Sequence, residues 1–369
     1  MNVNVDPCLA RWSERIRAAA ADRAPLCLRG SGSKDFYGQS LVGELFDTRD
    51  YAGLTAYEPT ELVVTARCAT PLAELEAALA EKGQSLSFEP PHFGPAATVG
   101  GCFAAGFSGP RRARAGAVRD FVLGVKILDG QGRLLNFGGQ VMKNVAGYDV
   151  SRLLAGSLGT LGLVVEVSLK VMPVASAEQT LCFELPGGNS QSLALARLNQ
   201  WGGRPLPISA SAWIGEVLHL RLSGAAAAVS AAAQKLGGER VAPEAATAFW
   251  HSLREQSHAF FRASQASALW RLAVPATTPA LALSGAQLVE WGGAQRWLHA
   301  ASTADHQTIR QAAAQAGGHA TLFRADPATK AAVGVFQPLT APLARIHQEL
   351  KAAFDAPGVF NPGRMYPEF

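Results

Sequence analysis

Apolar residues recur at helical spacing in two stretches of the N-terminal half and gather into short strand-like runs between them. The first stretch, residues 7–21, predicts a helix with Trp12 on its apolar side. The second, residues 71–82, predicts a helix with Thr70 as N-cap and Pro71 at its first position. The apolar runs predict strands over residues 25–28, 62–67, 121–128, 134–137 and 163–171.

Beyond residue 175 the chain changes to apolar strands mixed with Ala-rich helices. Strands combined with helices that can cover one face of a sheet indicate an α+β domain. Since 369 residues are too many for one ordinary core, we expect a domain boundary at this point. The expected strands are residues 180–185, 208–214, 217–222, 269–274, 286–291, 296–301 and 319–323, and the expected helices are residues 190–201, 225–236, 303–316 and 342–354.

Glycine is concentrated between residues 94 and 162, which hold fifteen of the 37 glycines in separate clusters. Glycine accepts positive φ angles and lets backbone amides approach a ligand closely. Several glycine turns converging from one sheet predict a backbone-lined cradle for an extended anionic cofactor, and a dinucleotide is the natural candidate.

Charge and cysteine content exclude several classes of protein. The net charge is +4, and the basic residues are dispersed apart from Arg111, Arg112, Arg114 and Arg119, so we expect no nucleic-acid binding. These four arginines serve either the anionic groups of a ligand or a solvated loop. The five cysteines include no CxxC pair, so we expect no disulfide framework and no metal or iron–sulfur site. There is no signal-like apolar core and no run long enough to span a membrane, so a cytoplasmic protein is expected.

Three blocks of residues could carry the chemistry. The loop 29–34 (Arg-Gly-Ser-Gly-Ser-Lys) follows a predicted strand and is either an anion-binding nest or a plain Gly-Ser turn. The second block joins residues 90–94, 98–101 and 108–111; its His92 is either an acid–base group or a histidine held by a loop hydrogen bond. The third block, residues 143–162, ends in a Gly-rich turn that either contacts the cofactor or forms a bulged hairpin.

Together these blocks resemble the FAD-binding domain of the vanillyl-alcohol oxidase/PCMH flavoprotein superfamily and, within it, the FAD-binding E subunits of bacterial glycolate oxidase (glycolate dehydrogenase). The likeness covers nearly the whole chain. It implies a PCMH-type FAD-binding domain of two subdomains over residues 1–175, a smaller α+β cap over 176–352, and a C-terminal segment, 353–369, that returns to the FAD domain. The likeness is carried by ATVGG, SGPRRARAGAVRD, NVAGYDVSRLLAGSLGTLG, LWRLAVP, VEWGGAQRWL and VFNPGRMYP.

The resemblance also implies where FAD is held. The loop 29–34 is implied to bind the pyrophosphate, and residues 98–101 and 108–111 to line the diphosphate and flavin. Because no His follows the loop, where relatives often attach FAD covalently, the implied FAD is non-covalent. The implied contacts are Arg29, Gly30, Ser31, Gly32, Ser33, Lys34, Pro91, Thr98, Val99, Gly100, Gly101, Ser108, Gly109, Arg111, Gly116, Ala117, Gly159, Gly162, Val164 and Asn361.

The sequence departs from the family in two places. Residues 68–70 read Cys-Ala-Thr where relatives commonly have Ala-Gly-Thr, which puts close backbone approach there in doubt. The catalytic 2-hydroxy-acid dehydrogenases of the family carry paired metal-binding histidines and a Gly-Asp-Gly-Asn-type motif in the cap, and this chain has neither. His251 and His258 are seven residues apart, a spacing that puts them on one helix face, where we expect a packed or solvated pair.

The resemblance implies a flavoprotein subunit of a complex that oxidises glycolate to glyoxylate and passes electrons to an acceptor other than oxygen. We expect a relay or supporting flavin here, a sister FAD subunit that holds the hydroxy-acid site, and an iron–sulfur subunit that takes the electrons. Contact with the inner membrane would be peripheral, through these partners. The alternatives are a stand-alone FAD-dependent alcohol or 2-hydroxy-acid dehydrogenase with His92 as base, and a flavin-free scaffold. Arg271 and Arg296 are either positive groups beside the flavin or an interface, or exposed strand-edge arginines.

Overall fold

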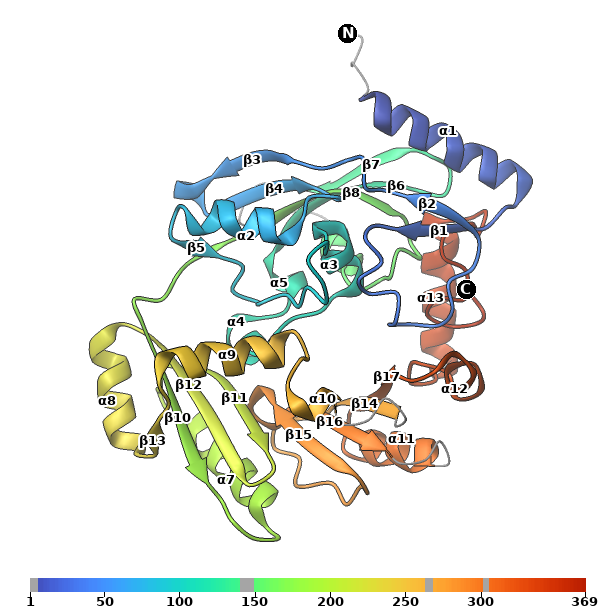
Figure 1. Ribbon diagram of the computed structural model, residues 1–369. Helices are drawn as coiled ribbons and strands as arrows, with labels where there is room; N and C mark the ends of the chain where they lie inside the picture. The colour runs from blue at the N-terminus through green and yellow to red at the C-terminus, as the bar shows by residue number, and fades with distance from the viewer. Residues whose placement is uncertain (1–5, 140–148, 263–267, 301–304) are drawn as a thin grey trace.

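The computed structural model describes residues 6–139, 149–262, 268–300 and 305–369. Two β-sheets lie one above the other in Figure 1, and helix α13 (Ala341–Phe354) runs along one side of the molecule. The chain builds the upper unit first, crosses to the lower unit after β9 (Met172–Pro173), and returns at its C-terminal end to pair with β1 (Leu26–Arg29).

The upper unit is organised around a five-stranded antiparallel sheet with the order β3-β4-β8-β6-β7. Its central strand β8 is buried almost throughout, as expected for a strand covered on both faces, although Glu166 and Ser168 interrupt its apolar residues. The strands are β3 (Leu54–Glu58), β4 (Val63–Arg67), β6 (Val122–Leu128), β7 (Leu134–Gly138) and β8 (Leu163–Lys170).

Short elements surround this sheet. Strands β1 and β2 (Glu44–Asp47) form a parallel pair, and β5 (Gln84–Ser85) pairs with β9. Asp6 caps the first helix by accepting a hydrogen bond from the Cys8 amide. The helices are α1 (Pro7–Asp22), α2 (Leu72–Ala80), α3 (Val99–Ala105), α4 (Arg112–Ala115), α5 (Val118–Phe121) and α6 (Val150–Leu153), with a 3-10 turn η1 (Pro59–Glu61).

The lower unit contains an eight-stranded antiparallel sheet with the order β13-β10-β12-β11-β15-β16-β14-β17. Side chains alternate between its two faces, as the pleat of a strand requires. On β12, for example, Leu218, Leu220 and Leu222 enter an apolar core with α7 and α8, whereas Arg221 reaches the upper unit. The strands are β10 (Ala177–Glu184), β11 (Ile208–Ile214), β12 (Val217–Gly224), β13 (Glu239–Arg240), β14 (Ala268–Ala273), β15 (Ala286–Glu290), β16 (Gln295–Ala300) and β17 (His319–Arg324).

Helices cover the two faces of this sheet unequally. The face away from the upper unit packs on α7, α8 and α11, while α9 lies between the sheet and the upper unit (Figure 1). A third apolar cluster joins the units, since Tyr37 and Phe107 pack with Trp297 and Phe323. The elements are α7 (Ser190–Gly202), α8 (Ala226–Leu236), α9 (Pro243–Arg254), α10 (Ala259–Arg262), α11 (His306–Gln315), α12 (Pro327–Val333) and the 3-10 turn η2 (Trp291–Gly293).

Each strand expected from an apolar run is found within a few residues, but two local predictions are wrong and helix α3 was not predicted. Thr70 is not an N-cap: α2 begins after Pro71, and the Thr70 hydroxyl bonds the backbone of Gly53 instead. Residues 99–105, for which the sequence predicted no element, form helix α3. His251 and His258 do not share a helix, because α9 ends at Arg254. The domain limits 1–175, 176–352 and 353–369 stay a prediction, and of the predicted block 143–149 only Asp149 lies within the described residues.

Candidate functional site

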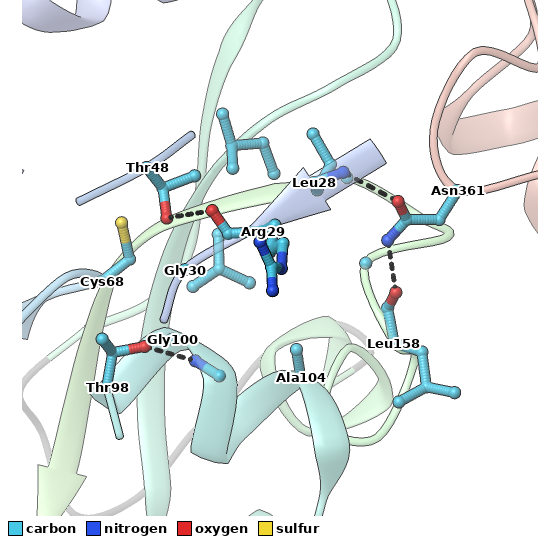
Figure 2. Close-up of a pocket in the computed structure, with 15 residues that line it drawn as sticks. Leu28, Arg29, Gly30, Thr48, Cys68, Thr98, Gly100, Ala104, Leu158 and Asn361 are labelled. Atoms are coloured by element: carbon cyan, nitrogen blue, oxygen red, sulfur yellow. Dashed lines mark hydrogen bonds between the residues drawn. The ribbon is translucent and has the colours of Figure 1, made fainter. Parts of the chain in front are cut away.

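Two adjoining cavities of about 80 and 90 Å³ form one elongated cleft in the upper unit, beside the end of β1 and the start of α3 (Figure 2). Its walls are the loop 29–34, residues 98–104, the turn 158–164 and Asn361. The predicted FAD contacts that line it are Arg29, Gly30, Ser31, Gly32, Ser33, Lys34, Thr98, Gly100, Gly101, Gly159, Gly162, Val164 and Asn361.

The loop after β1 supplies the positive charge of the cleft. The guanidinium of Arg29 is held by Asp35, with Nε 2.7 Å and Nη2 2.6 Å from Oδ2. The ammonium of Lys34 donates to the His92 carbonyl at 3.1 Å, and burial lowers the pKa of Lys34. Gly32 between them has φ +79°, a conformation that favours glycine. A lysine of lowered pKa without a carboxylate partner among the described residues is suited to an anionic ligand.

The two glycines at the start of α3 serve different purposes. A Cβ on Gly100 would lie 2.8 Å from Cys68 Cβ and 2.9 Å from the Cys68 carbonyl oxygen, so Gly100 permits the helix to approach the end of β4. A Cβ on Gly101 would meet only Thr98 Oγ1 within 4 Å, at 3.2 Å, so this position opens on the cleft. The amides of both glycines are already used, by the Cys68 carbonyl at 2.8 Å and by Thr98 Oγ1 at 3.1 Å. The helix start therefore gives the cleft its shape and leaves anion binding to the loop.

Asn361 closes the cleft opposite α3 (Figure 2). Its Oδ1 accepts from the Leu28 amide at 2.8 Å, and its Nδ2 donates to the Leu158 carbonyl at 2.7 Å. Its φ of +40° is one that asparagine tolerates better than most residues. A Cβ on Gly159 would lie 2.8 Å from the Asn361 amide nitrogen, so Gly159 makes room for this bridge. One side chain thus joins the N-terminal strand, the Gly-rich turn and the C-terminal segment.

A smaller cavity, about 30 Å³ in volume, lies between the upper and lower units. From the upper unit it is lined by Pro91 and by residues 107–110, and from the lower unit by inward-facing residues of several strands. Ala105 lines the cleft and Phe107 lines this cavity, so the segment between them separates the two spaces. The strand residues that line the cavity are Arg271, Glu290, Gln295, Trp297 and Phe323.

Arg271 is the predicted positive group that faces this cavity. Its Nη2 donates to the Tyr37 hydroxyl at 3.0 Å, and its guanidinium carbon lies 5.3 Å from the centre of the Phe323 ring. Among the described residues it has no carboxylate partner. Arg296, which was predicted together with Arg271, points to the other face of the sheet. It donates to the carbonyls of Thr278, Pro279 and Gly293.

Five further predicted residues lie outside both spaces. The His92 ring stands 3.1 Å from Glu76 of α2, at the far side of its loop. Arg111 is engaged by Glu89 and Glu178, and the Ala117 amide donates to Asp120 at 2.8 Å. The remaining two are Val99, which is buried in the core, and Gly116, which ends α4.

Glu290 is the residue of this region that the sequence prediction missed. It follows Leu288 on the inward face of β15, and the residue is 4% exposed. The Trp297 indole nitrogen and the Gln295 amide both donate to Oε2, at 2.7 and 3.0 Å. Burial raises the pKa of Glu290 to about 7. The alternation of strand positions Leu288 and Glu290 could have marked this acid as inward-facing.

Other kinds of site are not evident in the described residues. No group of three or more His, Cys, Asp or Glu side chains there could hold a metal ion, and all five cysteines are free. None of the helices in this part of the chain is both long and apolar enough to cross a membrane.

Comparisons with known proteins decide the family. A family described as FAD binding domain matches residues 10–138. The glycolate oxidase subunit GlcE of Escherichia coli is 48% identical over 355 residues, which cover 96% of both chains. This chain belongs to the GlcE family. The family resemblance and the α+β, PCMH-type fold expected from the sequence are therefore confirmed, and the chain carries an FAD-binding domain of a flavin-dependent oxidoreductase.

More distant relatives match mainly part of the chain. The glycolate oxidase subunit GlcD of Bacillus subtilis is 30% identical over 46% of this chain and 36% of its own, and a D-lactate dehydrogenase of Archaeoglobus fulgidus is 32% identical over 46% and 38%. A solved structure of alkyldihydroxyacetonephosphate synthase has the same fold, with a TM-score of 0.63 at 13% identity over 95% of this chain and 74% of its own.

The residues that line the cleft of this GlcE-family chain suit an extended anionic ligand such as a dinucleotide. The open side of Gly101 leaves room that a Cβ would fill, and Lys34 stands without a carboxylate partner among the described residues. The individual FAD contacts listed from the sequence remain predictions.

Proposed function

We propose that this chain is the FAD-binding subunit of a glycolate-oxidising complex, and that its FAD, held non-covalently, relays electrons or supports the assembly. The observation that carries the proposal is the elongated cleft in which the loop 29–34, the start of α3 and Asn361 face one another. The family membership of the chain supports the same assignment.

The residues of the cleft have separable roles in this proposal. Lys34 and the backbone of residues 30–33 bind the pyrophosphate, and Gly101 leaves space for it. Asn361 fixes the distance between the loop and the Gly-rich turn. Arg271 supplies a positive charge at the flavin end. Bound FAD supplies the oxidation–reduction chemistry, and the protein sets its position and electrostatics.

The surroundings of His92 favour a relay over direct glycolate oxidation by this chain. His92, the base of the stand-alone alternative, is paired with Glu76 and does not line the cavity between the two units. We therefore propose that glycolate reacts in a sister FAD subunit and that an iron–sulfur subunit receives the electrons. Association with the inner membrane is proposed to be peripheral, through these partners.

The test is a visible spectrum of the purified chain, followed by anaerobic addition of glycolate. We expect a flavin band that glycolate does not bleach until the sister subunit is added. Bleaching of the isolated chain would refute the relay and favour a stand-alone dehydrogenase. A chain that neither contains nor takes up FAD would refute the flavin role and favour a scaffold.

A further inference from the structure

Glu290 is a buried acid that has no cationic partner among the described residues. Its carboxyl lies at the cavity between the two units, and no Lys or Arg of the described residues stands within ion-pair distance of it. A buried carboxylate is costly unless it is paired with a cation, so such an acid tends to hold a proton. The Glu290 carboxyl is therefore held toward its neutral form.

Its hydrogen bonds leave one oxygen available. Its two donors among the described residues, Trp297 Nε1 and Gln295 Nε2, bind the same atom, Oε2. Among the described residues no donor binds Oε1, and Glu290 belongs to the wall of the cavity. These two bonds fix the carboxyl group in place and favour its ionised form, whereas burial opposes ionisation and dominates.

The charges around Glu290 are few. Glu89, on the loop before α3, raises the pKa of Glu290 through its negative charge. Arg271 and Arg254 line the same cavity, but Arg271 is directed to Tyr37, and Arg254 pairs with Glu255 at 2.9 Å. A new negative charge in or beside this cavity would therefore act on Glu290 with little compensation.

We propose that Glu290 is a redox-linked proton site, which binds one proton when the FAD of this chain is reduced and releases it when the FAD is oxidised. The inference rests on the proposed function. The proposed function puts Arg271 at the flavin end, and Arg271 and Glu290 line the same cavity. Two-electron reduction of the FAD would therefore add negative charge beside this cavity, and a like charge favours the neutral carboxyl. The electrons come from the reductant, and water supplies both the proton that accompanies flavin reduction and the proton that Glu290 binds.

The linkage has a measurable signature. For a two-electron couple, each additional bound proton shifts the potential by about 30 mV per pH unit. Below pH about 7 Glu290 is protonated in both states, so it adds nothing to this slope. Above that pH, reduction takes up the extra proton, and the slope steepens by about 30 mV per pH unit until the acid of the reduced form also ionises.

The experiment is potentiometric titration of the FAD-loaded chain across pH 6 to 9, with dithionite as reductant. We expect the break in the wild type and its loss in Glu290→Gln, while the control Glu244→Gln, which changes an exposed acid on α9, keeps it. Trp297→Phe retains the ring but removes a bond that favours ionisation, so its break should move to higher pH.

Each result decides the matter. A Glu290→Gln profile that superimposes on the wild type, or a Trp297→Phe break that moves to lower pH, overturns the proton site while leaving the FAD role intact. If Glu290→Gln does not fold, the direction of the Trp297→Phe shift alone decides. A chain that binds no FAD refutes the proposed function, and the proton site with it.

Discussion

The adjacent glycines of α3 allow one chemical change to be tested in two environments. In Gly100→Ala the new methyl group would lie 2.8 Å from Cys68 Cβ and 2.9 Å from a backbone oxygen, where ordinary contacts begin at 3.4 Å. Overpacking of this kind costs about 1–3 kcal/mol. In Gly101→Ala the methyl group meets only Thr98 Oγ1, at 3.2 Å, and replacing a helical glycine gains about 0.5–1 kcal/mol.

The two variants should therefore affect different quantities, Gly100→Ala the stability of the chain and Gly101→Ala the binding of FAD. We expect Gly100→Ala to lower the free energy of unfolding of the FAD-free chain. Gly101→Ala should keep or slightly raise that free energy but weaken FAD binding at least tenfold, equivalent to about 1.4 kcal/mol, because the methyl group enters the cleft. Urea unfolding measures the first quantity and titration of flavin fluorescence the second. Wild-type FAD affinity in Gly101→Ala would refute the cleft assignment, and wild-type stability in Gly100→Ala would refute the packing argument.

Three further perturbations follow from the contacts described above. Asn361→Ala leaves the Leu28 amide unpaired and should cost about 2 kcal/mol in urea unfolding, with weaker FAD binding; an unchanged affinity would contradict its bridging role. Arg221→Met removes the two bonds that Arg221 makes to the Glu89 carboxylate, at 2.8 and 2.9 Å, and leaves Arg111 as its partner, so it should cost about 2 kcal/mol; a stable variant would show that this pair does not join the units. Burial lowers the pKa of His219 to about 4, so the unfolded chain binds more protons between pH 6.5 and 4 and stability falls as pH decreases through that range. His219→Gln should flatten this part of the pH–stability profile, and an equally steep profile in that variant would count against the assignment.

Most helices and strands could be predicted because the spacing of their apolar residues matches the faces that they bury in the fold. The mainly apolar runs that predicted β6, β8, β11 and β14 form largely buried strands, since burial against other elements is the usual way to remove their apolar side chains from water. Helix α3 was missed because two consecutive glycines lower helix propensity. Gly100 is required because α3 lies close to Cys68 at the end of β4, and a contact between such distant segments cannot be predicted from the local sequence. The Thr70 cap failed for the same reason, since its hydroxyl is taken by Gly53.

The candidate site likewise contains residues that could be predicted from the sequence and residues that could not. The loop 29–34 could be located because a Gly-Ser stretch ending in lysine after a strand is typical of an anion-binding nest, although a plain turn has the same pattern. The carboxylate partners of Arg111 could not be predicted, because Glu89 and Glu178 come from two different units and meet Arg111 only in the folded chain. Side chains alternate between the two faces of a strand, and this alternation assigns Arg296 to the outer face of the sheet and Glu290 to the cavity.

The bridge made by Asn361 also governs the order in which the molecule can be built. Leu26 pairs with Phe360, and the Asn361 amide donates to the Leu26 carbonyl at 3.0 Å, so the cleft needs contacts between segments more than 330 residues apart. Contacts of such long sequence separation form late because a large loop must close first. A chain still being synthesised can assemble the first sheet, but its cleft stays incomplete until the second sheet has been made and residues 359–361 have reached β1. Loading with FAD should therefore be one of the last events in maturation, and variants that slow folding of the second sheet should delay it.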